Sequence, residues 1–264
     1  MYNAENKTAT LPSGAEMYYA RFGKGEKTLV LIPGLNIADM NGTAVNLAYF
    51  YRKFTKDFTV YVFDRRTGRD PGCTIQSMAD DVAAAMETIG LGGAYVGGVS
   101  QGGMIAQCIA IYHPEVTDRL ILAVTAPYCN DIARDAVGTW IEMAKRDDYA
   151  ALFADTAEKT YSEKYLAKNR KTFPLVAKLT KPASFERFFR NAYAIMDFEV
   201  RSELHRIKAP TLILAGDNDH IVGNDAPYEL NRGIEGSKLY IYNGLGHSAY
   251  EEGKDFYDRV FEFL

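Results

Sequence analysis

The sequence predicts an α/β protein with a mostly parallel central sheet, helices on both faces and a long helical insertion. Short apolar runs that stop at glycine or proline alternate along the chain with segments whose apolar residues recur at helical spacing. The stretch 127–208 interrupts this alternation, because it is helical in pattern and contains no strand-like run. We therefore expect a core formed by 1–126 and 209–264, and a helical cap formed by 127–208.

Apolar runs mark the segments that are predicted to form the sheet. They are 15–22, 28–32, 58–63, 94–99, 119–125, 211–216 and 238–242. The first alternates only weakly and is expected to be antiparallel. The run 28–32 is continuously apolar and stops at Pro33-Gly34, as a parallel strand buried on both faces would. A parallel sheet keeps its active site beyond the carboxyl ends of its strands, so the insertion is expected beside that site.

Helical spacing marks the segments between these strands. The predicted helices are 44–56, 75–89, 101–113 and a final segment after Glu251. In the second of them Ile75, Val82 and Met86 fall on one side, which would face the sheet. Pro114 directly follows the third, where a proline ends a helix because it cannot continue the hydrogen bonds.

The composition excludes several classes of protein. With 30 Lys+Arg against 34 Asp+Glu, the net charge of −4 gives no support for nucleic-acid binding. The sequence contains no run of about 18 apolar residues, so it predicts no membrane-spanning helix. The polar segment 1–11 lacks the apolar centre of a signal peptide. Cys73, Cys108 and Cys129 form no C-x-x-C pair, which argues against a disulfide framework or a structural zinc site. We expect a cytoplasmic protein that acts on a small molecule without a metal or cofactor.

The strongest chemical signal is a G-x-S-x-G motif, Gly98-Val99-Ser100-Gln101-Gly102, which follows a predicted strand and opens a predicted helix. In that context the motif indicates a nucleophile elbow, a tight turn that pushes the serine hydroxyl out of the sheet. Gly98 and Gly102 are needed because a side chain there would collide with the neighbouring strand or helix. The alternative is a glycine-rich turn that only packs a helix on a strand. We predict that Ser100 is a nucleophile.

A serine hydroxyl needs a nearby base to take its proton, and the chain offers four histidines. No motif around His113, His205 or His220 suggests a base. His247 lies in the sequence Gly-Leu-Gly-His-Ser, directly after the last predicted strand. A glycine-flanked loop at the carboxyl end of a strand can bring the imidazole to the serine, so His247 is the predicted base. The alternative is a loop histidine exposed to solvent.

The third group must be a carboxylate that fixes the imidazole tautomer and stabilises the imidazolium. Asp217 and Asp219 both follow the predicted strand 211–216. Asp217 comes first and is well placed to tie down the turn through backbone bonds, whereas Asp219 lies further towards the site and is preferred. Asp131 is a third candidate, soon after another predicted strand. The order serine, aspartate, histidine matches one known triad arrangement.

These motifs resemble those of the α/β-hydrolase superfamily, and the resemblance covers nearly the whole chain. It is carried by the elbow GVSQGG, the acid loop GDNDHIV, the histidine loop GLGHS and the strand-end segment LIPGLN. The resemblance implies the α/β-hydrolase fold, with 127–208 as a helical cap inserted after the sixth strand. It also implies an oxyanion hole of backbone N–H groups, which fall here at Leu35 and Gln101. Many relatives have His-Gly where this chain has Pro33-Gly34.

The segment Asp64-Arg65-Arg66-Thr67-Gly68 resembles the family's Asp-x-Arg-Gly turn after the fourth strand. In relatives this turn is mostly structural. The resemblance therefore implies that its arginines are turn and surface residues, with a role as ligands as the alternative.

A serine nucleophile predicts acyl transfer to water, whereas epoxide hydrolases and haloalkane dehalogenases of this family need an aspartate at the elbow. We therefore expect a serine hydrolase that cleaves an ester, lactone or thioester through an acyl-enzyme. A C–C bond hydrolase or a cofactor-free haloperoxidase would use the same triad. A non-catalytic small-molecule binding protein would usually have lost one triad member.

The insertion 127–208 is expected to select the substrate. Its Trp140, the only tryptophan, is the predicted substrate-binding residue, with packing inside the cap as the alternative. Its phenylalanines are expected mostly in the cap's own core, and the apolar character suggests a small to medium hydrophobic acyl or aryl group. The insertion carries 15 Lys+Arg and 12 Asp+Glu, which would steer anionic substrates or would simply be solvated surface.

Overall fold

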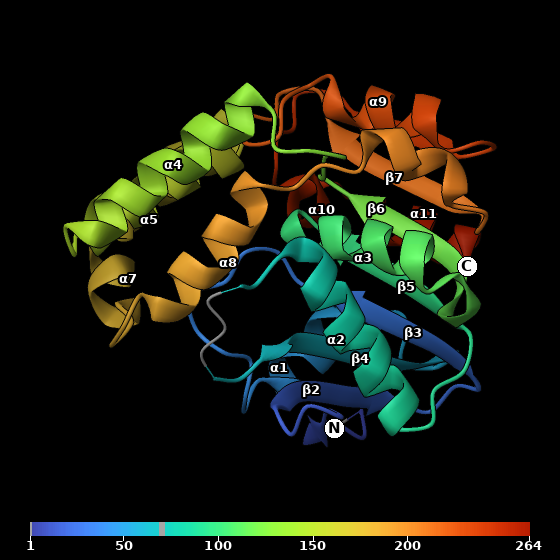
Figure 1. Ribbon diagram of the computed structural model, residues 1–264. Coiled ribbons are helices and arrows are strands. Elements are labelled where there is room, and N and C mark those ends of the chain that lie inside the picture. Colours follow the sequence, from blue (N-terminus) through green and yellow to red (C-terminus); the bar gives the residue numbers. More distant parts are fainter. Residues whose placement is uncertain (1, 69–71) are drawn as a thin grey trace.

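The computed structural model describes residues 2–68 and 72–264, so Met1, the start of the polar N-terminal segment, lies outside the described residues. Its centre is an eight-stranded sheet with the strand order β1-β2-β4-β3-β5-β6-β7-β8. Figure 1 shows helices on both faces of this sheet and the helices of the insertion gathered at one end of it, at the upper left. The predicted α/β architecture with a helical insertion is confirmed.

The strands have these bounds: β1 (Glu5–Thr10), β2 (Glu16–Gly23), β3 (Lys27–Ile32), β4 (Phe58–Arg66), β5 (Ala94–Val99), β6 (Thr117–Ala123), β7 (Thr211–Gly216) and β8 (Lys238–Tyr242). β2 is antiparallel to both of its neighbours, β1 and β4, and every other adjacent pair is parallel. The carboxyl ends of β3 to β8 therefore meet at one edge of the sheet, where ligands bind in such folds.

β2 and β3 lie within one residue of their predicted bounds, and β6 begins and ends two residues before the predicted 119–125. Two strands differ more from the sequence prediction. The sequence pattern does not predict β1, because only Ala9 of its six residues is buried. An edge strand that hides a single side chain shows no alternation of apolar residues, and pairing with β2 holds it instead. β4 continues past the predicted end at residue 63 to Arg66, which pairs with Met17 of β2.

The helices of the core have these bounds: α1 (Ala44–Phe50), α2 (Ile75–Thr88), α3 (Gln101–Tyr112), α9 (Ala226–Gly233), α10 (Ala249–Glu252) and α11 (Phe256–Phe263), with the 3₁₀ turn η1 (Pro114–Val116). Another 3₁₀ turn, η3 (Arg201–Arg206), lies at the end of the insertion. α1 is shorter than predicted, because the N–H groups of Phe54 and Thr55 donate to the carbonyls three residues back and form turns. α9 is not predicted. It is short and buries little besides Ala226, Pro227 and Leu230, although a proline in the first turn is typical of a helix start.

The insertion between β6 and β7 is helical, as predicted. Its helices are α4 (Asp131–Lys145), α5 (Tyr149–Thr160), α6 (Glu163–Asn169), η2 (Arg170–Thr172), α7 (Phe173–Thr180) and α8 (Glu186–Met196). The side chains of Asn130, Asp148 and Ser162 accept hydrogen bonds from the first turns of α4, α5 and α6, which satisfies otherwise free N–H groups. One isolated β-bridge, between Tyr128 and Glu199, joins the two ends of the insertion.

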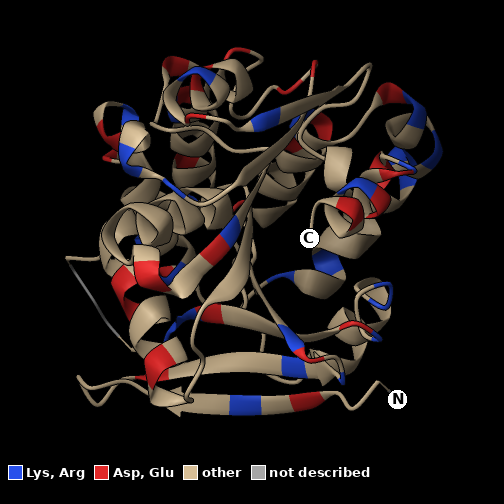
Figure 2. Ribbon diagram, turned by 90° about the vertical axis from the view of Figure 1, so that its right-hand side faces the viewer, with Lys and Arg blue, Asp and Glu red and all other residues tan. Residues whose placement is uncertain are grey.

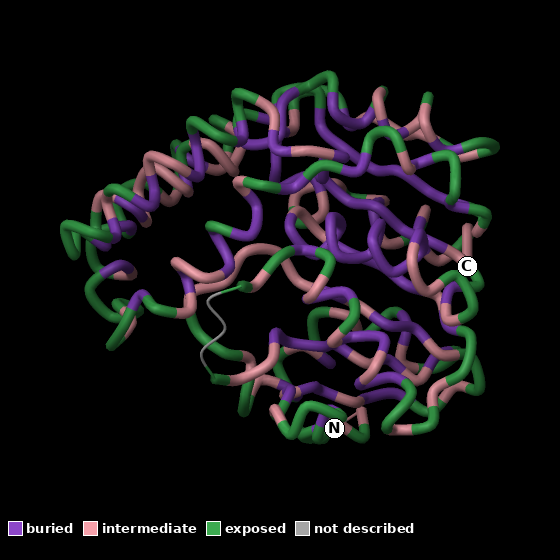
Figure 3. The backbone as a smooth tube through the Cα atoms, in the orientation of Figure 1, coloured by how far each residue is buried: buried purple, intermediate pink, exposed green. Residues whose placement is uncertain are grey.

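Alternating side chains of each central strand pack into two cores on opposite faces of the sheet. Leu120 and Leu122 of β6 point into the core covered by α2, α3 and α9, whereas Ile121 and Ala123 point into the core covered by α1, α10 and α11. In Figure 3 the central strands are buried along most of their length, and the helices of the insertion are buried on one side only. The sheet is therefore a rigid base for the loops at its carboxyl edge.

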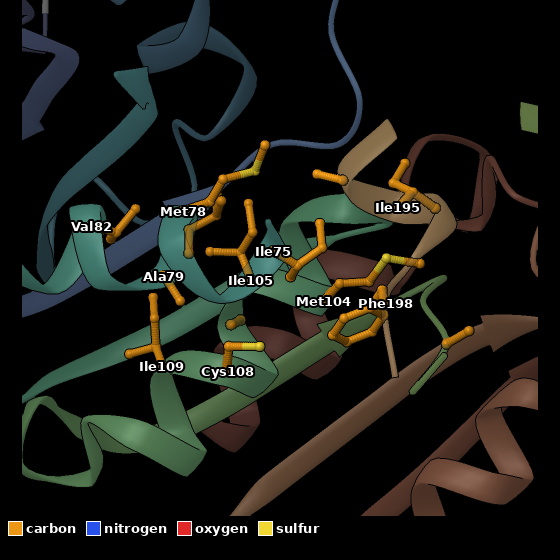
Figure 4. Packing of buried hydrophobic residues seen from close by; sticks show 14 of the residues in the cluster. Ile75, Met78, Ala79, Val82, Met104, Ile105, Cys108, Ile109, Ile195 and Phe198 are labelled. Atoms are coloured by element: carbon orange, nitrogen blue, oxygen red, sulfur yellow. The ribbon is translucent and has the colours of Figure 1, made fainter. Parts of the chain in front are cut away.

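The packing of α2 on α3 fixes the helix that follows Ser100. Figure 4 shows Met78 and Ala79 of α2 against Ile105 and Ile109 of α3. In the same view Phe198, which follows the insertion's last helix, lies beside Met104 of α3, and both belong to one buried cluster. The start of α3 is thus held by the core and by the end of the insertion.

Charged residues lie mostly on the outer faces of helices and on the β1–β2 edge, while most of the central strands are free of them (Figure 2). Among the described residues, no helix combines the length and the apolar character that crossing a membrane requires.

Candidate active site

Ser100 lies in a strained turn between β5 and α3. Its backbone φ of 55° is in the left-handed region that L-residues seldom adopt. A Cβ atom on Gly98 would lie 2.1 Å from the carbonyl oxygen of Gly102, and one on Gly102 would lie 2.0 Å from the oxygen of Ile32. Both glycines are therefore required by close backbone contacts, as the G-x-S-x-G motif indicates. The turn presents Ser100 at the carboxyl edge of the sheet.

Hydrogen bonds to β6 and the loop after it hold Ser100 in place. Its N–H donates to the carbonyl of Ala123 at 2.9 Å, and its own carbonyl accepts from the Thr125 hydroxyl at 2.8 Å. Gly103 packs on the same threonine, because a Cβ there would lie 2.6 Å from Thr125 Cβ. The strained backbone is thus secured on both sides of the serine.

His247 and Asp219 form a buried pair. Nδ1 of His247 lies 2.8 Å from Oδ2 of Asp219, and the two residues are 7% and 4% exposed. The other carboxylate oxygen accepts from the N–H groups of Ile221 and Val222, at 2.8 and 3.0 Å. Burial by itself raises the pKa of Asp219, but His247 and these two N–H groups outweigh it and hold the pKa below its usual value. The carboxylate is therefore ionised at neutral pH and fixes the imidazole.

The other candidate acids lie elsewhere. Asp217 is exposed, and its carboxylate accepts from the N–H of Gly244 at 2.7 Å, which ties the ends of β7 and β8 together. Asp131 is the exposed first residue of α4 and borders a different cavity from the one beside Ser100.

The other histidines have different surroundings. His113 caps α3 and lies 2.7 Å from Asp80. His205 is an exposed residue of the turn η3. His220 is exposed and does not border the cavity beside Ser100, although it neighbours Asp219 in the sequence.

The two predicted oxyanion donors flank Ser100. Leu35 follows Gly34, where a Cβ would lie 3.3 Å from Ser100 Cβ, so this loop touches the serine. Gln101 is the first residue of α3. Within the described part of the chain, the backbone N–H groups of Leu35 and Gln101 have no hydrogen-bond acceptor. Both N–H groups are therefore available to a ligand, as the first N–H groups of a helix are.

Arg65 corrects the expectation that the arginines of the Asp-x-Arg-Gly-like turn are surface residues. It is 2% exposed, and its Nη2 donates to the carbonyl oxygens of Pro33 and Gly34 and to Oε1 of Gln101. Burial lowers the pKa of Arg65 to about 10, while the charge of Asp64 opposes that shift. The guanidinium thus stays protonated at neutral pH, and it binds the loop that carries Leu35.

A cavity of about 310 Å³ lies beside Ser100 and His247, which both border it. The core contributes Leu35, Ile221 and Tyr250 among others. The insertion contributes most of the remaining lining, including Trp140, Tyr149, Leu152, Phe153, Thr156 and Phe188. No Lys, Arg, Asp or Glu is among the described lining residues. The cavity is therefore apolar and electrically neutral away from the histidine.

Trp140 borders this cavity and also packs within the insertion. It is 5% exposed, and its Nε1 donates to Oδ2 of Asp155 at 2.7 Å. Trp140 thus borders the cavity and also belongs to the buried hydrophobic cluster, so both the prediction and its alternative describe part of its surroundings. The sequence analysis does not single out Thr156, which borders the same cavity. Its hydroxyl is buried and has no hydrogen-bond partner among the described residues. A single threonine in a helix gives no signal of this kind.

The arrangement has the parts that nucleophilic acyl transfer needs. Ser100 and His247 border one cavity, Asp219 orients the ring, and two free N–H groups flank the serine. Within the described residues no hydrogen bond joins Ser100 Oγ to His247. Such bonds are often formed only in the complex with substrate.

A family model described as the alpha/beta hydrolase fold matches residues 27–254. The AB hydrolase superfamily protein YisY of Bacillus subtilis (strain 168) is 34% identical over 193 residues, which are 70% of this chain and 70% of that protein. A putative carbamate hydrolase and a 3-oxoadipate enol-lactonase are 24% and 22% identical to this chain. A 2-hydroxy-6-oxononadienedioate/2-hydroxy-6-oxononatrienedioate hydrolase of Pseudomonas putida is 44% identical, but over 64 residues, which are 24% of this chain and 22% of that protein. The relatives thus share a fold and differ in substrate.

Solved structures agree with this assignment of the fold. MGS-M2, an α/β-hydrolase enzyme from a Medee basin deep-sea metagenome library, has a TM-score of 0.87 at 21% identity and covers 97% of this chain and 96% of its own. The enol-lactonase from Burkholderia xenovorans LB400 has a TM-score of 0.83 at 22% identity and covers 98% and 99%. The fold predicted from the sequence motifs is confirmed, including a helical insertion after β6.

Proposed function

Because the chain belongs to the α/β-hydrolase family, we propose that it is a serine hydrolase that cleaves a carboxylic ester, lactone or thioester through an acyl-enzyme on Ser100. One observation carries this proposal. Ser100 and His247 border the same neutral cavity, and the Nδ1 atom of His247 is held by the buried carboxylate of Asp219. The other ring nitrogen is thereby left to serve the cavity.

The reaction begins when Ser100 Oγ attacks the substrate carbonyl carbon and His247 Nε2 takes the hydroxyl proton. The carbonyl oxygen becomes an oxyanion, which the N–H groups of Leu35 and Gln101 stabilise. The tetrahedral species collapses, and His247 gives the proton to the leaving alcohol, thiol or ring oxygen. Water then attacks the acyl-enzyme with His247 as base, which releases the acid and restores Ser100.

Asp219 acts through His247. Its carboxylate accepts a hydrogen bond from the Nδ1–H group of His247, so the Nε2 atom is free to take the proton of the serine. His247 itself and, to a smaller extent, the two backbone N–H groups on the other carboxylate oxygen keep Asp219 ionised, and the ionised carboxylate stabilises the imidazolium that forms during attack.

The cap 127–208 is proposed to select the acyl group, because it supplies most of the cavity lining. A cavity of about 310 Å³ is near the lower end of the usual range for small-molecule sites. The absence of charged side chains among the described lining residues favours a neutral acyl group over a carboxylate-bearing one, since an unpaired buried carboxylate is costly. Trp140 is proposed to contact that group.

A panel of substrates tests the proposal. The p-nitrophenyl esters of butyrate and of succinate have acyl groups of equal length and differ by one carboxylate, and a lactone and an acyl thioester extend the panel. We expect hydrolysis of the neutral compounds, with the butyrate ester preferred over the succinate ester by about 100-fold in kcat/KM. Ser100→Ala is the matched blank and should lower turnover by at least about 10³-fold. Turnover that survives in Ser100→Ala would contradict the proposal.

A further inference from the structure

One buried guanidinium touches both segments that carry the oxyanion donors. Nη2 of Arg65 lies 2.7 Å from the carbonyl oxygen of Pro33, 3.1 Å from that of Gly34 and 2.9 Å from Oε1 of Gln101. Arg65 comes from the end of β4, whereas the other residues come from the loop after β3 and the start of α3. The side chain therefore fixes the distance between these two segments.

The contact with Gly34 acts on the N–H of Leu35 directly. The Gly34 carbonyl and the Leu35 N–H belong to one planar trans peptide, in which C=O and N–H point in opposite directions. A cation that binds the oxygen on one side therefore aims the N–H to the other side. It also polarises the peptide and strengthens the N–H as a donor, because hydrogen bonds along a chain reinforce one another.

Hydrogen bonds to Asn191 of the insertion complete a ring of contacts at the loop after β3. Gln101 Nε2 donates to the carbonyl oxygen of Asn191 in α8 at 2.6 Å. Asn191 Nδ2 lies 3.3 Å from Oδ1 of Asn36, whose own Nδ2 donates to Asp64 Oδ1 at 3.2 Å. Asp64 also accepts from the N–H of Arg65 at 2.8 Å, which closes the ring. We call Asn36, Asp64, Arg65, Gln101 and Asn191 the loop network.

Burial makes the loop network stiff. Asp64, Gln101 and Asn191 are completely buried and Arg65 is 2% exposed, so water cannot replace a lost hydrogen bond. A buried charge would not be tolerated here without such partners. The network binds Gly34 and Asn36, the residues on either side of Leu35 in the chain.

We propose that Arg65 is a positioning residue of the oxyanion hole, which aims and polarises the N–H of Leu35 and holds the start of α3 against it. The inference rests on the proposed function. A purely structural arginine would affect stability and leave the chemical step of the folded enzyme unchanged. A positioning role lowers kcat more than it raises KM, because the oxyanion exists only in the transition state.

Arg65→Met tests this with the full chain, the p-nitrophenyl butyrate assay and butylboronic acid, which Ser100 binds as a tetrahedral adduct. We expect kcat to fall about 100-fold, similar to the loss of one oxyanion donor, with KM changed less than about threefold. The inhibition constant of butylboronic acid should rise by a similar factor. Arg66→Met is the matched control, since the neighbouring arginine pairs with Asp81 at 3.3 Å, and its kcat should stay within about threefold of wild type.

A second variant keeps the test valid if Arg65→Met does not fold. Gln101→Leu keeps Arg65 and both backbone N–H groups but removes the link to residue 101, and we expect about a tenfold loss in kcat. An unchanged kcat in folded Arg65→Met or Gln101→Leu would overturn the inference. A loss of kcat/KM that comes entirely from a raised KM, with an unchanged inhibition constant of butylboronic acid, would also overturn it. If Ser100→Ala is inactive while Arg65→Met keeps its kcat, only this inference fails. Activity of Ser100→Ala would instead reject the proposed function itself.

Discussion

Asp64 at the end of β4 and Arg187 at the start of α8 form an ion pair between the sheet and the insertion, although 123 residues separate them in the sequence. The carboxylate is completely buried and the arginine side chain is 15% exposed. Asp64 also accepts from the N–H of Met40 at 2.9 Å. The pair therefore joins the insertion to the loop after β3, which carries Leu35.

Removing Arg187 should destabilise the protein, because it leaves a buried carboxylate without its cation. We expect Arg187→Met to lower the free energy of unfolding by about 3 kcal/mol, measured by urea denaturation at pH 7. In the variant that also carries Asp64→Asn the loss should be smaller than the sum of the two single losses. Additive losses would show that the two side chains do not interact.

Most of the fold follows from sequence patterns, since the strands 211–216 and 238–242 are predicted with their observed bounds. All six residues of β7 are buried, so that strand has a continuous apolar run. β8 buries only Tyr242, but its other side chains after Lys238 are partly buried and apolar or aromatic. β1 and α9 bury few side chains, so no period marks them. Their positions depend on pairing and packing with segments that are distant in the sequence.

Local sequence patterns also predict part of the candidate site. Ser100 and His247 lie in glycine-rich motifs whose spacing is visible in the sequence, because the backbone there must pass close to its neighbours. The buried position of Arg65 and its contact with Gln101 are not visible. The two residues meet only because β4 and β5, the strand that leads into α3, lie on either side of β3 in the folded sheet.

Asp219 and Asp217 provide a matched pair of substitutions. Asp219→Asn should lower kcat by about 10³–10⁴-fold with the fold retained, because an amide in this position favours the wrong imidazole tautomer. Asp217→Asn should leave kcat within about threefold, since that carboxylate binds only the turn at Gly244. Steady-state kinetics of both variants, with circular dichroism as the check of folding, would make the comparison. A larger loss in Asp217→Asn at unchanged stability would show that the acid is misassigned.

The lowered pKa of Asp219 predicts a pH dependence of stability. A carboxylate whose folded pKa lies below its ordinary value of 3.8 stabilises the protein at pH values above 3.8 and loses this contribution as the pH falls through the folded pKa. The difference in unfolding free energy between wild type and Asp219→Asn should therefore be constant near neutral pH and shrink below about pH 4. Urea titrations between pH 7 and pH 3 measure it. A difference in unfolding free energy that stays constant from pH 7 to pH 3 would contradict a lowered pKa of Asp219 in the folded protein.

Trp140 should affect both substrate choice and stability, because it borders the cavity and also binds Asp155. Trp140→Ala should lower the free energy of unfolding by about 3–5 kcal/mol, and it should shift the preference in kcat/KM towards longer acyl chains by enlarging the cavity. Trp140→Phe keeps an aromatic ring but loses the hydrogen bond and part of the ring volume, so its preference should stay closer to wild type than that of Trp140→Ala. A uniform fall across p-nitrophenyl esters of rising acyl length in Trp140→Ala would assign the residue to packing alone.

The central claim is that Ser100 forms the covalent intermediate. Incubation with a fluorophosphonate, followed by mass spectrometry of the intact protein and of its peptides, tests this most directly. We expect a single adduct on the peptide that contains Ser100, none in Ser100→Ala and much slower labelling in His247→Ala, which lacks the base. An adduct that persists in Ser100→Ala, or a folded wild-type protein that takes up no label, would contradict it.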